Sequence, residues 1–140
     1  MLNLRLPFPI SANNYWQVVN KRLIKTKQAR AFIGEVVYRW MDYKTKGNKS
    51  FGKDDNLALS VAVFYPIKKG PDADLDNLCK VLIDAMETAQ IFPNDKQFRH
   101  IQLTRCHNPH KEGFVLVNIK KCNNSFTECN YNFIIKGIHK

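Results

Sequence analysis

The segment from residue 27 to residue 44 constrains the fold of this chain most, because its apolar side chains recur at helical spacing. They stand three and one positions apart, at Ala29, Phe32, Ile33, Val36, Val37, Trp40 and Met41. This period places them along one side of an α-helix, and such a stripe must be covered by another layer of the protein. Thr26 precedes the segment, and its hydroxyl is suited to cap the first free amides of the helix.

The rest of the chain supplies the layer that such a helix needs. Five segments have the alternation or composition of strands: residues 2–6, 16–24, 57–66, 99–106 and 114–121. A turn at "NPHKEG" is expected to join the last two. A second helix is expected over about residues 75–90, with a core stripe at Leu75, Leu78, Leu82, Ala85 and Ala89.

Strands and helices do not alternate regularly along the chain, which favours the α+β class. With 140 residues, one hydrophobic core and one domain are expected. We therefore predict a single small α+β domain in which a mixed, mostly antiparallel sheet packs with two main helices. Residues from about 123 onward have no clear pattern and are left unassigned.

Charge narrows the classes of partner. Twenty-two Lys and Arg residues oppose twelve Asp and Glu residues, so the formal net charge is +10. In a small domain this imbalance favours a polyanionic partner, most often nucleic acid, with an acidic membrane surface as the weaker alternative.

Neither a membrane span nor a signal peptide is expected. No apolar run approaches the ~20 residues that a bilayer span requires. The opening "MLNLRLPFPIS" lacks the basic start and continuous apolar core of a signal peptide. A cytoplasmic location is therefore expected.

Four cysteines, at positions 79, 106, 122 and 129, would then lie in a reducing compartment, where a disulfide framework is not expected. A zinc site at "CHNPH" is the alternative, since Cys106, His107 and His110 stand close together. No CxxC pair accompanies them, and ordinary strand and loop positions account for them better.

The segment "PDADLDNLCK" places Asp72, Asp74 and Asp76 within five positions of an otherwise basic chain. One explanation is structural: Asp74 caps the second helix, and Asp76 forms an ion pair with Lys80 one turn later. The other explanation is a Mg²⁺ site, because hard cations prefer carboxylate oxygens. Asp95, just past the helix, would supply a third carboxylate if the chain folds back.

The stretch "DLDNLCKVLIDAMETAQIFPNDKQ" resembles the signature of the RusA family of Holliday junction resolvases. The matching positions are Asp74, Asp76, Asn77, Leu78, Lys80, Asp84, Ala85, Asp95 and Gln97. Near the N-terminus, "LPFPISANNYW" is similar to the opening of the same family, at Leu6, Pro7, Phe8, Pro9, Ser11 and Asn13. Together the resemblance spans about residues 4 to 105.

The resemblance implies an endodeoxyribonuclease that cuts four-way DNA junctions with Mg²⁺, or Mn²⁺ in its place, and acts as a homodimer. It assigns metal binding to Asp74, Asp76 and Asp95, and makes Lys80 an essential basic residue. Two positions depart from the family pattern. "IKKGPDA" stands where some members carry a run of arginines, and Asn94 stands where the family often has a second acid.

Contacts to the DNA backbone are expected from Asn13 and from basic side chains at Lys21, Arg22, Lys25, Lys27, Arg30, Lys68 and Lys69. The alternatives are a nuclease that prefers flaps or other branched DNA, and a basic nucleic-acid-binding protein without catalysis. A phage or prophage origin fits the resemblance.

Overall fold

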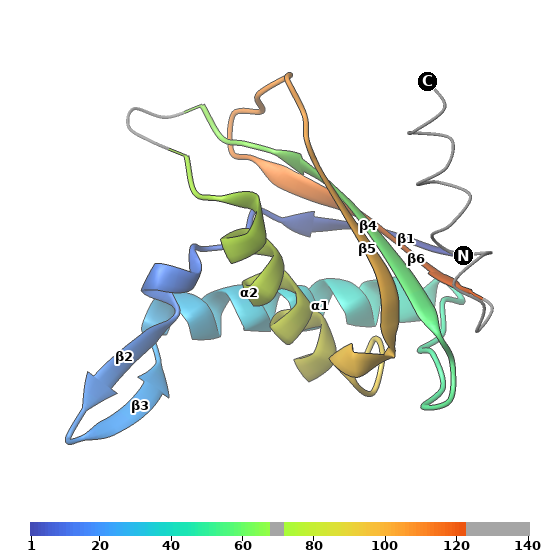
Figure 1. Ribbon diagram of the computed structural model, residues 1–140, viewed down its shortest axis with the longest axis horizontal. Helices are drawn as coiled ribbons and strands as arrows, with labels where there is room; N and C mark the ends of the chain where they lie inside the picture. The colour runs from blue at the N-terminus through green and yellow to red at the C-terminus, as the bar shows by residue number, and fades with distance from the viewer. Residues whose placement is uncertain (68–71, 123–140) are drawn as a thin grey trace.

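The computed structural model describes residues 1–67 and 72–122, which form two helices, a four-stranded sheet and a separate two-stranded hairpin (Figure 1). In chain order the elements are β1 Leu2–Pro7, η1 Ala12–Asn14, β2 Trp16–Val19, β3 Arg22–Lys25, α1 Lys27–Thr45, β4 Leu57–Phe64, α2 Leu75–Thr88, η2 Asp95–Gln97, β5 Phe98–Arg105 and β6 Phe114–Lys121. The predicted α+β class is confirmed. Among the described residues, no helix is both long and apolar enough to cross a membrane.

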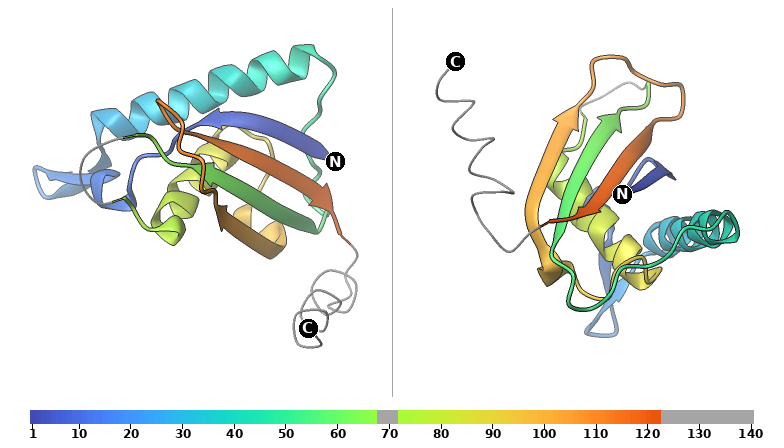
Figure 2. Two further views of the ribbon diagram at one scale, coloured as in Figure 1. Left: turned by 90° about the horizontal axis from the view of Figure 1, so that it is seen from above. Right: turned by 90° about the vertical axis from the view of Figure 1, so that its right-hand side faces the viewer.

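The main sheet has the strand order β1-β6-β4-β5. β6 is antiparallel to both of its neighbours, whereas β4 and β5 are parallel, so the prediction of a mixed sheet is confirmed. Alternate side chains of β1, β4 and β6 are buried, and both helices pack on that face (Figure 2). The described residues leave the opposite face open, as expected for a sheet with antiparallel pairing that is covered on one side.

The stripe predicted for the first helix is buried at five positions, Ala29, Phe32, Ile33, Val36 and Trp40. Met41, expected in the stripe, lies at its margin, and 60% of the residue is exposed. The predicted cap is confirmed, because the Thr26 hydroxyl accepts a hydrogen bond of 3.1 Å from the amide of Ala29. In α2, Leu78, Leu82 and Ala85 are buried as predicted.

Residues 16–24 form a hairpin rather than one strand. Asn20 and Lys21 have positive φ angles of 51° and 62°, the conformation of a tight hairpin turn. The hairpin projects from the body at the N-terminal end of α1 (Figure 1).

The connection between β5 and β6 is not the simple turn that was expected. It crosses the end of β4, because β4 lies between these two strands in the sheet. Gly113 has a φ of 73°, and a Cβ added there would stand 2.8 Å from the Pro66 ring. A glycine is therefore required where this connection crosses the end of β4.

Candidate active site

The segment before α2 is held by the ends of the two parallel strands. The hydroxyl of Tyr65, directly after β4, donates a hydrogen bond of 2.6 Å to the Ala73 carbonyl. Arg105, the last residue of β5, donates to the Asp72 carboxylate, and its guanidinium lies 4.2 Å from the centre of the Tyr65 ring. These contacts hold Asp72 and Ala73, the two residues that precede Asp74.

Tyr65 is suited to this role by its environment. Only 5% of the residue is exposed, and the Phe8 ring packs at 5.3 Å between centroids. Burial raises the pKa of the phenol above its ordinary value of 10.0, although Arg105 opposes the shift. The hydroxyl therefore stays protonated and remains a donor at neutral pH.

The three clustered carboxylates differ in their environments. Asp72 is partly buried and paired with Arg105. Asp74 occupies the N-cap position, where its carbonyl accepts from the Leu78 amide at 3.1 Å, but its side chain forms no capping hydrogen bond. Asp76 is exposed and, like Asp74, has no ion pair within the described part of the chain. Two carboxylates at the start of α2 thus have no ion pair with any described residue.

Two contacts that the structural explanation requires are not found, although Asp76 does lie in the first turn of α2, where its charge complements the helix dipole. The capping bond that it requires of Asp74 is not formed. The ion pair that it requires between Asp76 and Lys80 is not among those found in residues 1–67 and 72–122. Lys80 is exposed on the same helix, one turn after Asp76, and its ammonium is available to a ligand.

Asp95 lies at the other end of α2. The helix has 14 residues and is about 21 Å long, and Asp95 follows its end by seven positions. The described residues contain no group of three His, Cys, Asp or Glu side chains that could hold a metal ion. Within one chain, therefore, the fold-back expected to bring Asp95 to Asp74 and Asp76 does not occur.

The position of Asp95 is fixed by its neighbours in sequence. Gln97 is buried and donates to the carbonyls of Gly52, at 2.7 Å, and Asp55, at 3.0 Å. Asn94 and Gln97 also form a reciprocal cap around η2. These bonds tie η2 to the loop before β4 and leave the Asp95 carboxylate exposed.

Asp84, a further position of the motif, supports the hairpin. It accepts a hydrogen bond from the Tyr15 hydroxyl and forms an ion pair with Lys25 at 3.4 Å. Burial, and secondly the bond to Asp84, raises the pKa of Tyr15. Lys25, predicted to contact DNA, is thus engaged within the protein.

The other predicted DNA contacts gather around the same hairpin. Lys21 and Arg22 lie at its tip, and Lys27 and Arg30 lie in the first turn of α1; all four are exposed. Asn13 is exposed in η1. The predicted contacts Lys68 and Lys69 lie outside the described residues.

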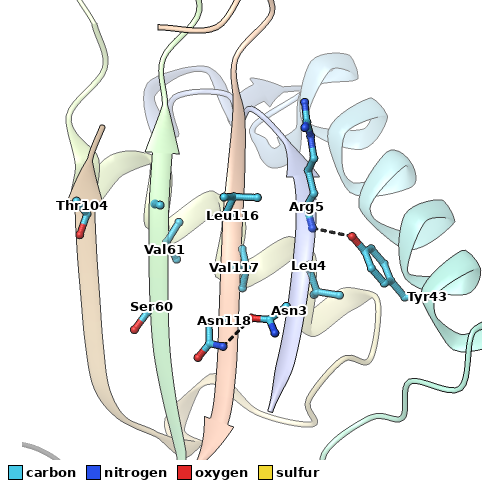
Figure 3. Close-up of a pocket in the computed structure, with 11 residues that line it drawn as sticks. Asn3, Leu4, Arg5, Tyr43, Ser60, Val61, Thr104, Leu116, Val117 and Asn118 are labelled. Atoms are coloured by element: carbon cyan, nitrogen blue, oxygen red, sulfur yellow. Dashed lines mark hydrogen bonds between the residues drawn. The ribbon is translucent and has the colours of Figure 1, made fainter. Parts of the chain in front are cut away.

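Two pockets differ in what they can bind. One, of about 440 Å³, lies on the open face of the sheet, between β1 and β5 (Figure 3). The described residues that line it include no acid, histidine or cysteine, so it offers no side-chain ligands of those types for a cation. The second, of about 390 Å³, lies beside the start of α2 and is lined by Tyr65, Asp72, Arg105 and His107 among others. The one acid among the described residues that line it is Asp72, which is paired with Arg105; Asp74 and Asp76 are not among these residues.

Tyr65 and Arg105 were not predicted from the sequence as residues of the site. Each stands at or directly after the end of a strand-like run, where loops at the carboxyl ends of parallel strands commonly form sites. That signal needs the strand order, which the local pattern does not contain.

Two carboxylates at a helix N-terminus, with no ion pair among the described residues, and a strongly basic α+β domain are features that metal-dependent enzymes acting on nucleic acid share. Residues 7–120 match the family model of endodeoxyribonuclease RusA. The chain belongs to this family, whose members are Holliday junction resolvases that hydrolyse phosphodiester bonds with the help of a metal ion. A comparison with curated proteins finds no match.

Proposed function

We propose that this chain is a Mg²⁺-dependent endonuclease that resolves four-way DNA junctions by paired, symmetric nicks in a homodimer. The observation that carries the proposal is the state of Asp74 and Asp76. Within residues 1–67 and 72–122 neither carboxylate has an ion pair, although the chain has ten more basic than acidic charges. The absence of basic partners is explained if a metal ion binds to these two carboxylates.

The donor set fits magnesium. Mg²⁺ is usually held by one or two carboxylates and keeps its other positions for water and phosphate oxygens. Asp74 and Asp76 offer oxygen ligands only, and Mn²⁺, which accepts the same ligands, is expected to substitute. When bound, the ion supplies Lewis-acid stabilisation of the charge that develops on the phosphate during hydrolysis.

The other residues of the site position the Asp74 carboxylate and neutralise the charge of the phosphate. Tyr65 and Arg105 fix the main chain before Asp74, so this carboxylate keeps its place when DNA approaches. Lys80, exposed one turn after Asp76, is placed to contact the phosphate and to balance its negative charge.

We further propose that Asp95 acts through the dimer. One chain separates Asp95 from Asp74 by the length of α2, and a two-fold axis offers a way to bring Asp95 of the partner subunit to the site. A junction is resolved by two nicks in opposing strands, so two identical sites related by such an axis match its symmetry.

The first test is cleavage of an end-labelled four-way junction in Mg²⁺ and in EDTA. Paired cuts at symmetric positions in Mg²⁺ alone are expected. Binding without cutting in either condition would favour a basic binding protein instead. Faster cutting of flaps than of junctions would favour the other branched substrate.

The second test mixes subunits that carry Asp76→Asn with subunits that carry Asp95→Asn. Each variant alone is expected to be inactive. A mixed dimer then has one site with both substitutions and one intact site, so nicking of one strand should return. If Asp95 serves its own chain, both sites of the mixed dimer are defective and no nicking returns; an active Asp95→Asn homodimer would remove Asp95 from the site.

A further inference from the structure

The β2–β3 hairpin exposes an apolar face that the body of the protein does not cover. Opposite residues on antiparallel strands share a face, and the register pairs Trp16 with Lys25 and Val18 with Leu23. The exposed fractions are 47% for Trp16, 71% for Val18 and 64% for Leu23. Three large apolar side chains thus form one contiguous surface toward solvent.

The base of the hairpin is firmly attached. The Thr26 amide donates to the Tyr15 carbonyl at 2.9 Å, and the Thr26 hydroxyl donates to the Asn14 carbonyl at 2.7 Å. Asp84 of α2 binds both Tyr15 and Lys25. The hairpin is therefore oriented by the same helix that carries the proposed active site.

The Trp16 ring packs edge-on against the Tyr15 ring, at 5.2 Å between centroids. Beyond Trp16, the described residues give the projecting part no such support. All four residues of β2 are exposed, and an isolated two-stranded hairpin is marginally stable in water. An apolar, projecting ribbon with a fixed base is the arrangement of an arm that is completed by a partner.

The charge of the surrounding chain selects that partner. Residues 1–34 contain no Asp or Glu, whereas their basic residues are Arg5, Lys21, Arg22, Lys25, Lys27 and Arg30. Two such arms facing each other would repel, so pairing of one arm with the arm of a second copy is disfavoured. DNA fits it, because phosphates attract the basic side chains and bases offer apolar surfaces for stacking.

We propose that the hairpin is a junction-opening arm, in which Trp16, Val18 and Leu23 pack against bases at the branch point while the flanking basic residues bind phosphates. At the branch, bases have lost a stacking neighbour, and apolar side chains commonly enter DNA at such weakened steps. A linear duplex lacks this opening. The inference depends on branched DNA as the ligand, and not on the metal site.

The test uses the full chain in EDTA, so that binding is observed without cutting. A double variant, Val18→Thr with Leu23→Thr, keeps side chains that favour strands but removes the apolar face. Val19→Thr is the matched control, because Val19 lies on the other face of the hairpin opposite Arg22. The probes are a four-way junction with 2-aminopurine at the branch and a linear duplex of the same length.

Wild type and the control are expected to raise the 2-aminopurine fluorescence and to prefer the junction over the duplex. The double variant should lose the rise and about fivefold to tenfold of the preference, since the apolar contacts of Val18 and Leu23 with the bases are lost while Trp16 is kept. The affinity for the duplex should not change, and neither should the oligomeric state measured by sedimentation.

An unchanged fluorescence rise and an unchanged preference would overturn the proposal. So would a shift from dimer to monomer on sedimentation, which would make the arm a subunit interface. Should the double variant fail to fold, Leu23→Thr alone is compared with Val19→Thr in the same assays. Loss of junction preference with normal cleavage of bound DNA would leave the proposed metal site untouched.

Discussion

Tyr65→Phe isolates the contribution of one hydroxyl to the geometry of the proposed metal site. The change keeps the ring that packs against Phe8 and Arg105, and removes only the bond of 2.6 Å to the Ala73 carbonyl. Because Tyr65 is 5% exposed, water replaces this donor poorly. We expect a loss of about 1–2 kcal/mol in the free energy of unfolding, and a melting temperature lower by about 3–6 °C.

The effect on metal use should be larger than the effect on stability implies. Ala73 directly precedes Asp74, so a loosened main chain displaces a proposed ligand. Loss of a group that orients a metal ligand typically costs about 10- to 100-fold in affinity or activity. We therefore expect the Mg²⁺ concentration for half-maximal junction cleavage to rise about tenfold, while junction affinity in EDTA is unchanged.

The assays are a Mg²⁺ titration of cleavage and a direct measurement of Mn²⁺ binding by electron paramagnetic resonance. Tyr43→Phe is the control, because it also removes one hydroxyl partner: the Tyr43 oxygen accepts from the Arg5 amide at 2.8 Å, at the β1 edge of the sheet. Identical Mg²⁺ requirements for the two variants would refute the positioning role of Tyr65.

Three further outcomes are expected. Junction affinity should fall steeply with salt, and Lys21→Gln with Arg22→Gln should reduce the slope of log affinity against log salt by about 2; an unchanged slope would mean that these side chains do not contact phosphate. Burial raises the pKa of Cys79 from its ordinary 9.0 to about 11, so between these pH values the folded protein keeps the thiol proton that the unfolded chain has lost, and the free energy of unfolding should fall as pH rises. Cys79→Ala should flatten that fall in denaturant titrations at pH 8 to 11, and an equally steep fall would contradict the assignment. Gly113→Ala should destabilise the fold by more than about 1 kcal/mol, because it adds a Cβ against the Pro66 ring at a positive φ; an unchanged melting temperature would show that the connection relaxes freely.

Local patterns predicted both helices and the four strands of the main sheet, but not the hairpin. The stripe from Ala29 to Trp40 and the Thr26 cap determine α1, because both depend on residues within a few positions of one another. Residues 16–24 were predicted as one strand and not as a hairpin. Its turn, at Asn20 and Lys21, lacks the glycine by which such turns are usually recognised in a sequence.

Contacts between distant residues limited the prediction of the site. The cluster of three aspartates was visible in the sequence. The sequence did not show which of them has a partner within the chain, because Asp72 pairs with Arg105, 33 positions later. Asp95 is separated from the cluster by a helix whose length could be predicted, yet only its packing shows that the chain does not return. A carboxylate supplied by a second subunit would depend on an interface between two chains, which the pattern of one sequence does not reveal.

The most direct measurement compares Asp76→Asn with Asp42→Asn on an end-labelled four-way junction in Mg²⁺. The two substitutions remove the same charge, and Asp42 is an exposed residue of α1 paired with Lys46. Asp76→Asn is expected to abolish cutting and to keep or tighten junction binding, because it removes a metal ligand and a charge that repels phosphate. Asp42→Asn should cut at the wild-type rate. Cutting by Asp76→Asn at that same rate would contradict the claim that this carboxylate holds the metal ion.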